Sequence, residues 1–188
     1  MTQKGSGVAG EARATERKQV WQLRTRELAF GDLPVLMGIV NVTPDSFSDG
    51  GSFFDPALAV EQGLRLADAG AGLIDVGGES TRPYSDPVAL DEELRRVIPV
   101  VSRLCEATDV PVSIDTSKAE VARQAVAAGA EIINDVTALS GDPEMPSFAA
   151  ECGAGVCLMH MQGTPQTMQD DPRYDDVIAE IATFLAAR

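Results

Sequence analysis

The alternation of short apolar runs with longer amphipathic runs constrains the fold of this chain more than any other feature. From Val35 onward, each apolar run ends in polar or glycine residues and leads into a segment with helical spacing of its apolar side chains. Short apolar runs in this setting predict the buried strands of a parallel sheet. The strands are predicted at Val35–Val40, Leu73–Val76, Val110–Ile114, Glu131–Ile133 and Gly155–Met159.

The segments between the strands carry helix signals. Asp55 followed by Pro56 is a favourable helix start, and Gly70 is a typical helix end. Ser117, with Glu120 three residues later, predicts a capping box at the start of another helix. The helices are predicted at Asp55–Ala69, Leu90–Thr108, Ser117–Ala128, Pro143–Cys152 and Tyr174–Ala187.

Strands that alternate with helices predict an α/β fold with a parallel sheet, either open and doubly wound or closed as a β/α (TIM-type) barrel. A doubly wound sheet gathers its site at one switch point, whereas a barrel takes one contribution from each strand end. Polar side chains stand at or just after the ends of five strands, at Asn41, Asp75, Asp115, Asn134 and His160. This distribution favours the barrel.

The length of the chain limits how much of a barrel it contains. A complete barrel has eight strands and typically about 250 residues, and this chain of 188 residues shows five strand candidates. We therefore expect about five of the eight β/α units, at residues 21–188, after a flexible polar leader at residues 1–20.

The composition excludes several classes of partner. With 15 basic and 29 acidic residues, the net charge of −14 argues against binding nucleic acid or an anionic membrane surface. No apolar run approaches the length of a membrane span. Cys105, Cys152 and Cys157 lie in apolar contexts without metal-ligand spacing, so we expect small buried side chains and a reducing, cytoplasmic setting.

Two polar segments after strands are candidate binding loops. The run Met37–Gly51 passes from an apolar strand into a cluster of Asn, Thr, Asp, Ser and Gly, as in a loop that presents ligand-binding groups. Gly77–Pro83 supplies glycine flexibility, hydroxyls and a cation. No dinucleotide fingerprint, Gly-rich phosphate loop or catalytic triad accompanies them.

Single polar residues after the later strands leave two interpretations open. Asp115 needs a partner, which is either a ligand with adjacent N–H donors or the backbone and Ser117 nearby. Asn134 both donates and accepts, which suits a heterocycle edge, while Asp135 beside it suits a structural role. His160 is the only histidine, so a multi-histidine metal site is excluded and a hydrogen-bonded structural role is the commoner one.

In this order and spacing, these segments resemble the amino-terminal two-thirds of the dihydropteroate synthases, from about Trp21 to the last residue. The resemblance implies a β/α barrel and a transferase of folate biosynthesis. Such an enzyme joins p-aminobenzoate to 7,8-dihydropterin-6-ylmethyl diphosphate and releases diphosphate, with Mg²⁺ as cofactor. The implied partners are these small molecules, with a homodimer allowed for the full-length form.

The resemblance also implies roles for residues of the first two loops. Asn41 matches an asparagine linked to Mg²⁺, and Thr81 matches a threonine that holds the diphosphate. Arg82 and Pro83 belong to the second substrate-binding loop, and Phe47 is implied to shield the aminobenzoate site.

The later strands are implied to supply the pterin site. Asp115 and Asn134 match the catalytic pair that reads the pterin edge, and Met159 is implied to line the same pocket. Loss of diphosphate leaves a pterin-stabilised cation that the aromatic amine attacks, so no protein nucleophile is needed. A buried carboxylate beside the ring favours that cation.

Some elements of the family pattern are absent from this sequence. They are a second pterin-binding Asp in an Asp-Pro-Gly segment, a Lys in a Ser-Arg-Lys-like segment and a terminal Arg-x-His. The chain therefore carries about half of the expected site. Two alternatives stay open: a non-catalytic or complementing pterin-binding fragment, and a pterin-dependent methyltransferase domain. The first two loops favour the synthase, because a methyltransferase has no diphosphate to hold.

Overall fold

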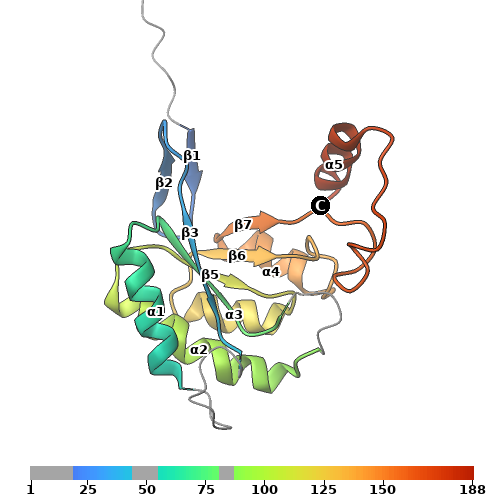
Figure 1. The fold of residues 1–188 in the computed structure, drawn as a ribbon. Coiled ribbons are helices and arrows are strands. Elements are labelled where there is room, and N and C mark those ends of the chain that lie inside the picture. The colour runs from blue at the N-terminus through green and yellow to red at the C-terminus, as the bar shows by residue number, and fades with distance from the viewer. Residues whose placement is uncertain (1–18, 44–54, 81–86) are drawn as a thin grey trace, which may run out of the picture.

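In the computed structural model, the described residues 19–43, 55–80 and 87–188 form a parallel sheet, a layer of helices and a small hairpin (Figure 1). The sheet follows the chain order β3-β4-β5-β6-β7. A doubly wound sheet would change direction at a switch point, so this order agrees with the predicted barrel. The strands are β3 (Met37–Asn41), β4 (Leu73–Gly77), β5 (Val112–Asp115), β6 (Ile132–Asp135) and β7 (Gly155–Leu158).

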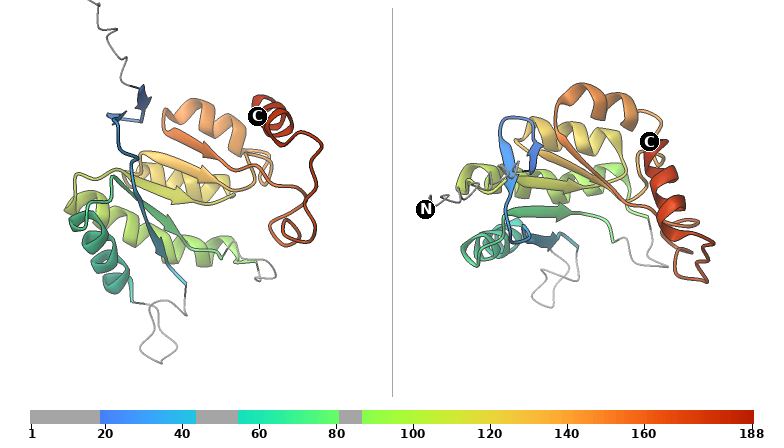
Figure 2. Two further views of the ribbon diagram at one scale, coloured as in Figure 1. Left: turned by 45° about the horizontal axis from the view of Figure 1, so that its top comes forward. Right: turned by 90° about the horizontal axis from the view of Figure 1, so that it is seen from above.

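Four helices form a layer against this sheet, in which each helix packs beside the next one along the chain (Figure 2). They are α1 (Pro56–Asp68), α2 (Leu90–Ala107), α3 (Ala119–Ala127) and α4 (Met145–Cys152). The last helix, α5 (Val177–Ala186), stands apart from this layer and buries none of its residues (Figure 1). No helix of the described part of the chain is long and apolar enough to cross a membrane.

The two faces of the sheet differ in burial because successive side chains of a strand point to opposite sides. The side chains of Val40, Val76 and Ile114 face the helices and are fully buried in the main core. The other face leaves Met37 45% and Ile39 55% exposed. This second face is the one that a closed barrel would turn inward, and it carries the polar side chains discussed below.

Helices α1 and α5 are each capped by the aspartate at their own N-cap position. Asp55 Oδ1 accepts a hydrogen bond from the backbone N–H of Ala57 at 2.8 Å, which confirms the predicted start of α1. Asp176 Oδ1 accepts from the N–H of Ala179 at 3.0 Å, so α5 begins after Asp176 rather than at the predicted Tyr174.

The predicted capping box at Ser117 is wrong. Helix α3 begins at Ala119, and its N-cap residue Lys118 makes no side-chain cap. The N–H of Ala119 instead donates to Asp142 Oδ2 at 2.9 Å, and Glu120 bonds side chains of its own helix. The capping carboxylate therefore comes from the following β/α unit, which no local sequence pattern indicates.

A hairpin that the sequence did not reveal precedes the sheet. Strands β1 (Gln19–Gln22) and β2 (Glu27–Phe30) pair antiparallel, and Leu23 in their turn is buried against the first residues of β4 and β6. The backbone N–H and the hydroxyl of Thr25 both donate to the buried carboxylate of Glu131. The hairpin thus covers the amino-terminal ends of the strands and leaves the opposite ends to the polar side chains.

Candidate functional site

The strand register places the predicted polar residues in one row. Asn41 pairs with Gly77, Gly77 with Asp115, and Asp115 with Asn134. Parallel neighbours in register share a face, so these side chains lie side by side at the carboxyl ends of the strands. A Cβ on Gly77 would lie 3.4 Å from the Asp115 carboxylate, so glycine here keeps the space beside that carboxylate open.

A second polar layer lies two residues earlier along the strands, on the same face of the sheet. Asp75 was predicted at the end of its strand, but it is the middle residue of β4. Its register partner on β5 is Ser113. Asp75 is only 3% exposed, and its Oδ2 accepts a hydrogen bond from Asn134 Nδ2 at 3.0 Å. Among the described residues, Asp75 Oδ1 and Ser113 Oγ form no hydrogen bond of normal length, although the Ser113 hydroxyl is close enough to lower the pKa of Asp75 in part.

The electrostatic setting of Asp115 is unusual for a carboxyl group. Burial and the neighbouring carboxylates of Asp75 and Glu93 raise its pKa from 3.8 to about 7. No described residue donates a hydrogen bond to its side chain, so the predicted structural pairing with Ser117 is not found. Burial also raises the pKa of Asp75. A ligand that brings N–H donors or positive charge to Asp115 would favour its ionised form.

The raised pKa of Asp115 predicts a specific pH dependence of stability. Between its unfolded and folded pKa values, the folded state binds more protons than the unfolded state, so this group's contribution is lost as pH rises from about 4 to about 7. We expect the wild-type chain to lose stability relative to Asp115→Asn between pH 5 and pH 8. Urea unfolding at each pH measures this difference, and parallel curves for the two proteins would contradict the assignment.

A pocket of about 190 Å³ opens beside Asp115, at the carboxyl ends of the strands. Its wall combines carboxylates with hydroxyl and amide side chains. The residues that line it include Glu79, Glu93, Asp115, Thr116, Thr137 and Gln166. Such a wall suits a ligand with several hydrogen-bond donors.

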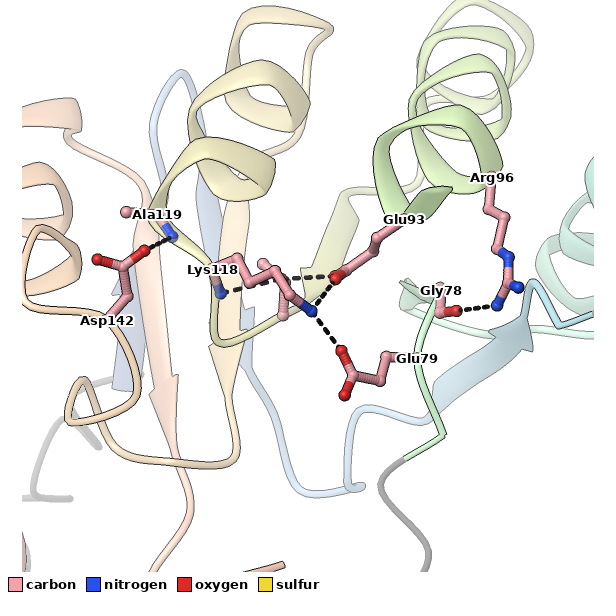
Figure 3. A network of polar contacts seen from close by, with 8 residues as sticks. Gly78, Glu79, Glu93, Arg96, Lys118, Ala119 and Asp142 are labelled. Atoms are coloured by element: carbon pink, nitrogen blue, oxygen red, sulfur yellow. Dashed lines mark hydrogen bonds and ion pairs between the residues drawn. The ribbon is translucent and has the colours of Figure 1, made fainter. Parts of the chain in front are cut away.

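An ion-pair network around the buried carboxylate of Glu93 forms one side of this pocket (Figure 3). Glu93 of α2 is fully buried and accepts from the hydroxyl of Thr116 at 2.7 Å. The ammonium group of Lys118 bridges Glu93 and Glu79. It thereby ties the segment after β4 and the helix α2 to the loop that follows Asp115. Sequence reasoning missed this network, because its members come from three separate segments.

Asp135 has the structural role that its place beside Asn134 suggested. Its side chain is fully buried and points to the helix side of the sheet. Its Oδ1 accepts from both the N–H and the hydroxyl of Thr137, at 2.8 Å and 2.7 Å, and its Oδ2 accepts from the N–H of Leu139 at 3.0 Å. Asp135 therefore shapes the loop after β6, while Asn134 faces the site.

The family model for pterin-binding enzymes matches residues 37–188 of this chain. The chain belongs to the pterin-binding enzyme family. A dihydropteroate synthase of Escherichia coli K12 is 55% identical over 151 residues, which cover 80% of this chain and 53% of the relative. The chain thus spans about half the length of this relative.

Solved structures agree with membership in this pterin-binding family. The dihydropteroate synthase of Xanthomonas albilineans with 4-aminobenzoic acid is 51% identical and has a TM-score of 0.80, covering 91% of this chain and 60% of that one. The enzyme of Burkholderia cenocepacia complexed with 7,8-dihydropteroate is 43% identical with a TM-score of 0.77, covering 90% and 56%. The sheet described here is therefore part of a β/α barrel.

Several predicted site residues of this family member lie outside the described residues. They are Phe47 in the first loop and Thr81, Arg82 and Pro83 in the second loop. Their predicted roles stay predictions.

The residues after β7 lie beside Asn134, at the end of the polar row opposite Asn41. Met159 follows β7 directly and is partly buried, and its predicted contact with a pterin ring stays a prediction. The imidazole of His160 packs edge-on against Phe184 of α5, with ring centroids 4.8 Å apart, and lies 5.8 Å from the ring of Tyr174. These contacts indicate that His160 orients the segment between β7 and α5.

The prediction of a buried Cys157 is wrong, whereas Cys105 and Cys152 are partly buried. Cys157 is exposed because it pairs in register with Asn134 and so lies on the polar face of the sheet. Partial burial of its sulfur and the carboxylates of Asp75 and Asp115 raise the pKa of its thiol. The thiol is therefore a weak nucleophile at neutral pH.

Proposed function

We propose that this chain supplies the pterin-binding half of a dihydropteroate synthase site. The observation that carries the proposal is the row of Asn41, Asp115 and Asn134 on adjacent strands of a barrel whose relatives are dihydropteroate synthases. The proposed substrates are 7,8-dihydropterin-6-ylmethyl diphosphate and p-aminobenzoate. Structures of relatives with 4-aminobenzoic acid and with 7,8-dihydropteroate support this pair of ligands.

The geometry suits a reaction that passes through a cation. The bond between the pterin methylene carbon and the diphosphate oxygen breaks, and the electron pair leaves with the diphosphate. The Asp115 carboxylate, beside the open space at Gly77, would offset the positive charge that develops on the ring. The amine nitrogen then forms the new C–N bond and loses a proton. Burial and the surrounding carboxylates raise the pKa of Asp115, and a cationic ring beside it would favour the ionised form that offsets the positive charge.

Mg²⁺ is part of this proposal as a partner of the diphosphate. The described residues contain no group of three or more His, Cys, Asp or Glu side chains that could hold a metal ion. Mg²⁺ at phosphate sites is commonly held by one or two protein oxygens together with the phosphates and water. The amide oxygen of Asn41, at the exposed end of β3, fits that pattern as a single protein ligand. The ion would neutralise charge on the leaving diphosphate.

Binding with and without Mg²⁺ tests the proposal. We expect the chain to retain the pterin diphosphate more tightly with Mg²⁺, and Asn41→Ala to reduce this Mg²⁺-dependent gain by about tenfold or more. Isothermal titration calorimetry measures both affinities. The matched control ligand is 6-hydroxymethyl-7,8-dihydropterin, which lacks the diphosphate and should bind the variant as well as the wild type.

The other outcomes identify the alternatives. Pterin binding whose affinity depends on neither Mg²⁺ nor the diphosphate would favour a pterin-dependent methyltransferase domain. Mg²⁺-dependent binding of the diphosphate without turnover by the 188-residue chain would favour a non-catalytic or complementing fragment. Cytoplasmic location and a homodimer of the full-length form stay predictions.

A further inference from the structure

The interior face of the sheet contains a buried carboxylate that the proposed reaction does not use. Asp75 lies at the centre of β4, is 3% exposed, and has one oxygen that forms no hydrogen bond of normal length with the described residues. Its other oxygen, Oδ2, accepts from the side-chain amide of Asn134, two strands away in the sheet. Asp75 therefore contacts a residue of the proposed site from below.

This hydrogen bond determines which way the Asn134 amide faces. The NH₂ group of Asn134, and not its side-chain oxygen, faces Asp75 and donates to its Oδ2 at 3.0 Å. The side-chain oxygen Oδ1 of Asn134 receives no hydrogen bond from the described residues, whereas its backbone carbonyl oxygen accepts from the N–H of Thr116 at 3.0 Å. The side-chain oxygen is left for the ligand, together with the second N–H of the same amide.

We propose that Asp75 is a positioning residue that fixes the orientation of the Asn134 amide and so sets the donor and acceptor pattern that the site reads. This inference rests on the proposed pterin-binding function. An amide fixed in this way offers one acceptor and one donor side by side. It complements a heterocycle edge with an exocyclic amino group next to a ring-nitrogen acceptor, which is the 2-amino and N1 edge of a pterin.

An Asn134 amide in the reversed orientation would favour a ring with the reversed pattern of donors and acceptors. A 2-oxo ring, as in lumazine, carries an oxygen acceptor in place of the amino group and an N–H donor at N1. The fixed orientation of Asn134 would place acceptor against acceptor and donor against donor with such a ring. Discrimination between the two rings therefore reports the orientation of Asn134, whereas overall affinity does not.

The variant Asp75→Asn keeps the shape of the side chain but can both donate and accept, so it allows Asn134 to adopt either orientation. We expect the wild-type chain to prefer 6-hydroxymethylpterin over 6-hydroxymethyllumazine, and Asp75→Asn to lower the affinity ratio by about tenfold. Calorimetric titration of both ligands measures the ratio. The matched control is Cys157→Ala, which changes the register partner of Asn134 on β7 and should leave the ratio unchanged.

Each outcome decides a different point. An unchanged ratio in a folded Asp75→Asn variant would overturn the positioning role, even if both affinities fall together, because a purely structural defect weakens both ligands alike. If Asp75→Asn does not fold, Asp75→Ser is measured instead, because its hydroxyl also donates and accepts. A wild-type chain that binds neither ring would instead overturn the proposed function itself.

Discussion

The variant Asp115→Ala is expected to lose pterin binding, with affinity for 6-hydroxymethyl-7,8-dihydropterin lowered by about 100-fold or more. Hydrogen bonds to a charged group contribute about 1.5–3 kcal/mol each, and two such bonds to one carboxylate account for that factor. In the structure, the Asp115 side chain faces the pocket, and no described residue competes for its oxygens. Titration calorimetry of the folded variant measures the loss.

A matched control separates the effect of losing a carboxylate of the site from the effect of losing one negative charge elsewhere on the chain. Asp109→Ala removes an exposed carboxylate near the hairpin, where the backbone carbonyl of Asp109 accepts from Arg26, and should leave pterin affinity unchanged. Pterin affinity of Asp115→Ala within about threefold of the wild type would remove Asp115 from the proposed site.

The second large effect concerns stability. Lys118→Met leaves the carboxylate of Glu93, whose side chain is 1% exposed, without its ammonium partner. Breaking a buried ion pair typically costs about 3–5 kcal/mol. Because the Lys118 side chain is 26% exposed, we expect a value near the lower limit, about 3 kcal/mol, in the free energy of unfolding. Urea denaturation monitored by circular dichroism measures it.

A double variant tests whether the unpaired Glu93 carboxylate causes the loss of stability in Lys118→Met. Adding Glu93→Gln to Lys118→Met removes the unpaired buried charge and should restore more than half of the lost stability. Arg95→Met, which breaks an exposed pair with Glu92 on the same helix, should cost less than about 1 kcal/mol. Equal losses in Lys118→Met and Arg95→Met would contradict a special role for the buried network.

The sequence was most informative where a physical constraint acts locally. The apolar runs predicted all five strands of the sheet, since a strand covered on both faces in a closed barrel needs apolar side chains along its whole length. The start of α1 at Asp55 followed from local capping chemistry. The polar residues that end the strands predicted the row of Asn41, Asp115 and Asn134, because parallel strands bring their carboxyl ends to one edge.

The sequence was least informative where residues meet through the fold. The cap on α3 comes from Asp142, and Asp75 reaches Asn134 across an intervening strand. Glu93 lies among charged residues at the start of α2 in the sequence, yet it is fully buried. The exposure of Cys157 likewise depends on which face of β7 it occupies, and a one-residue change in register would have reversed it.

The sequence by itself therefore determined the order of strands and helices, the barrel-type sheet and the row of polar side chains, because strand burial and helix capping act over a few neighbouring residues. Only the tertiary structure decided which carboxylates are buried, which are paired and which face the site. Burial and pairing depend on side chains that are distant in sequence, and these govern the pKa of Asp115 and the orientation of Asn134.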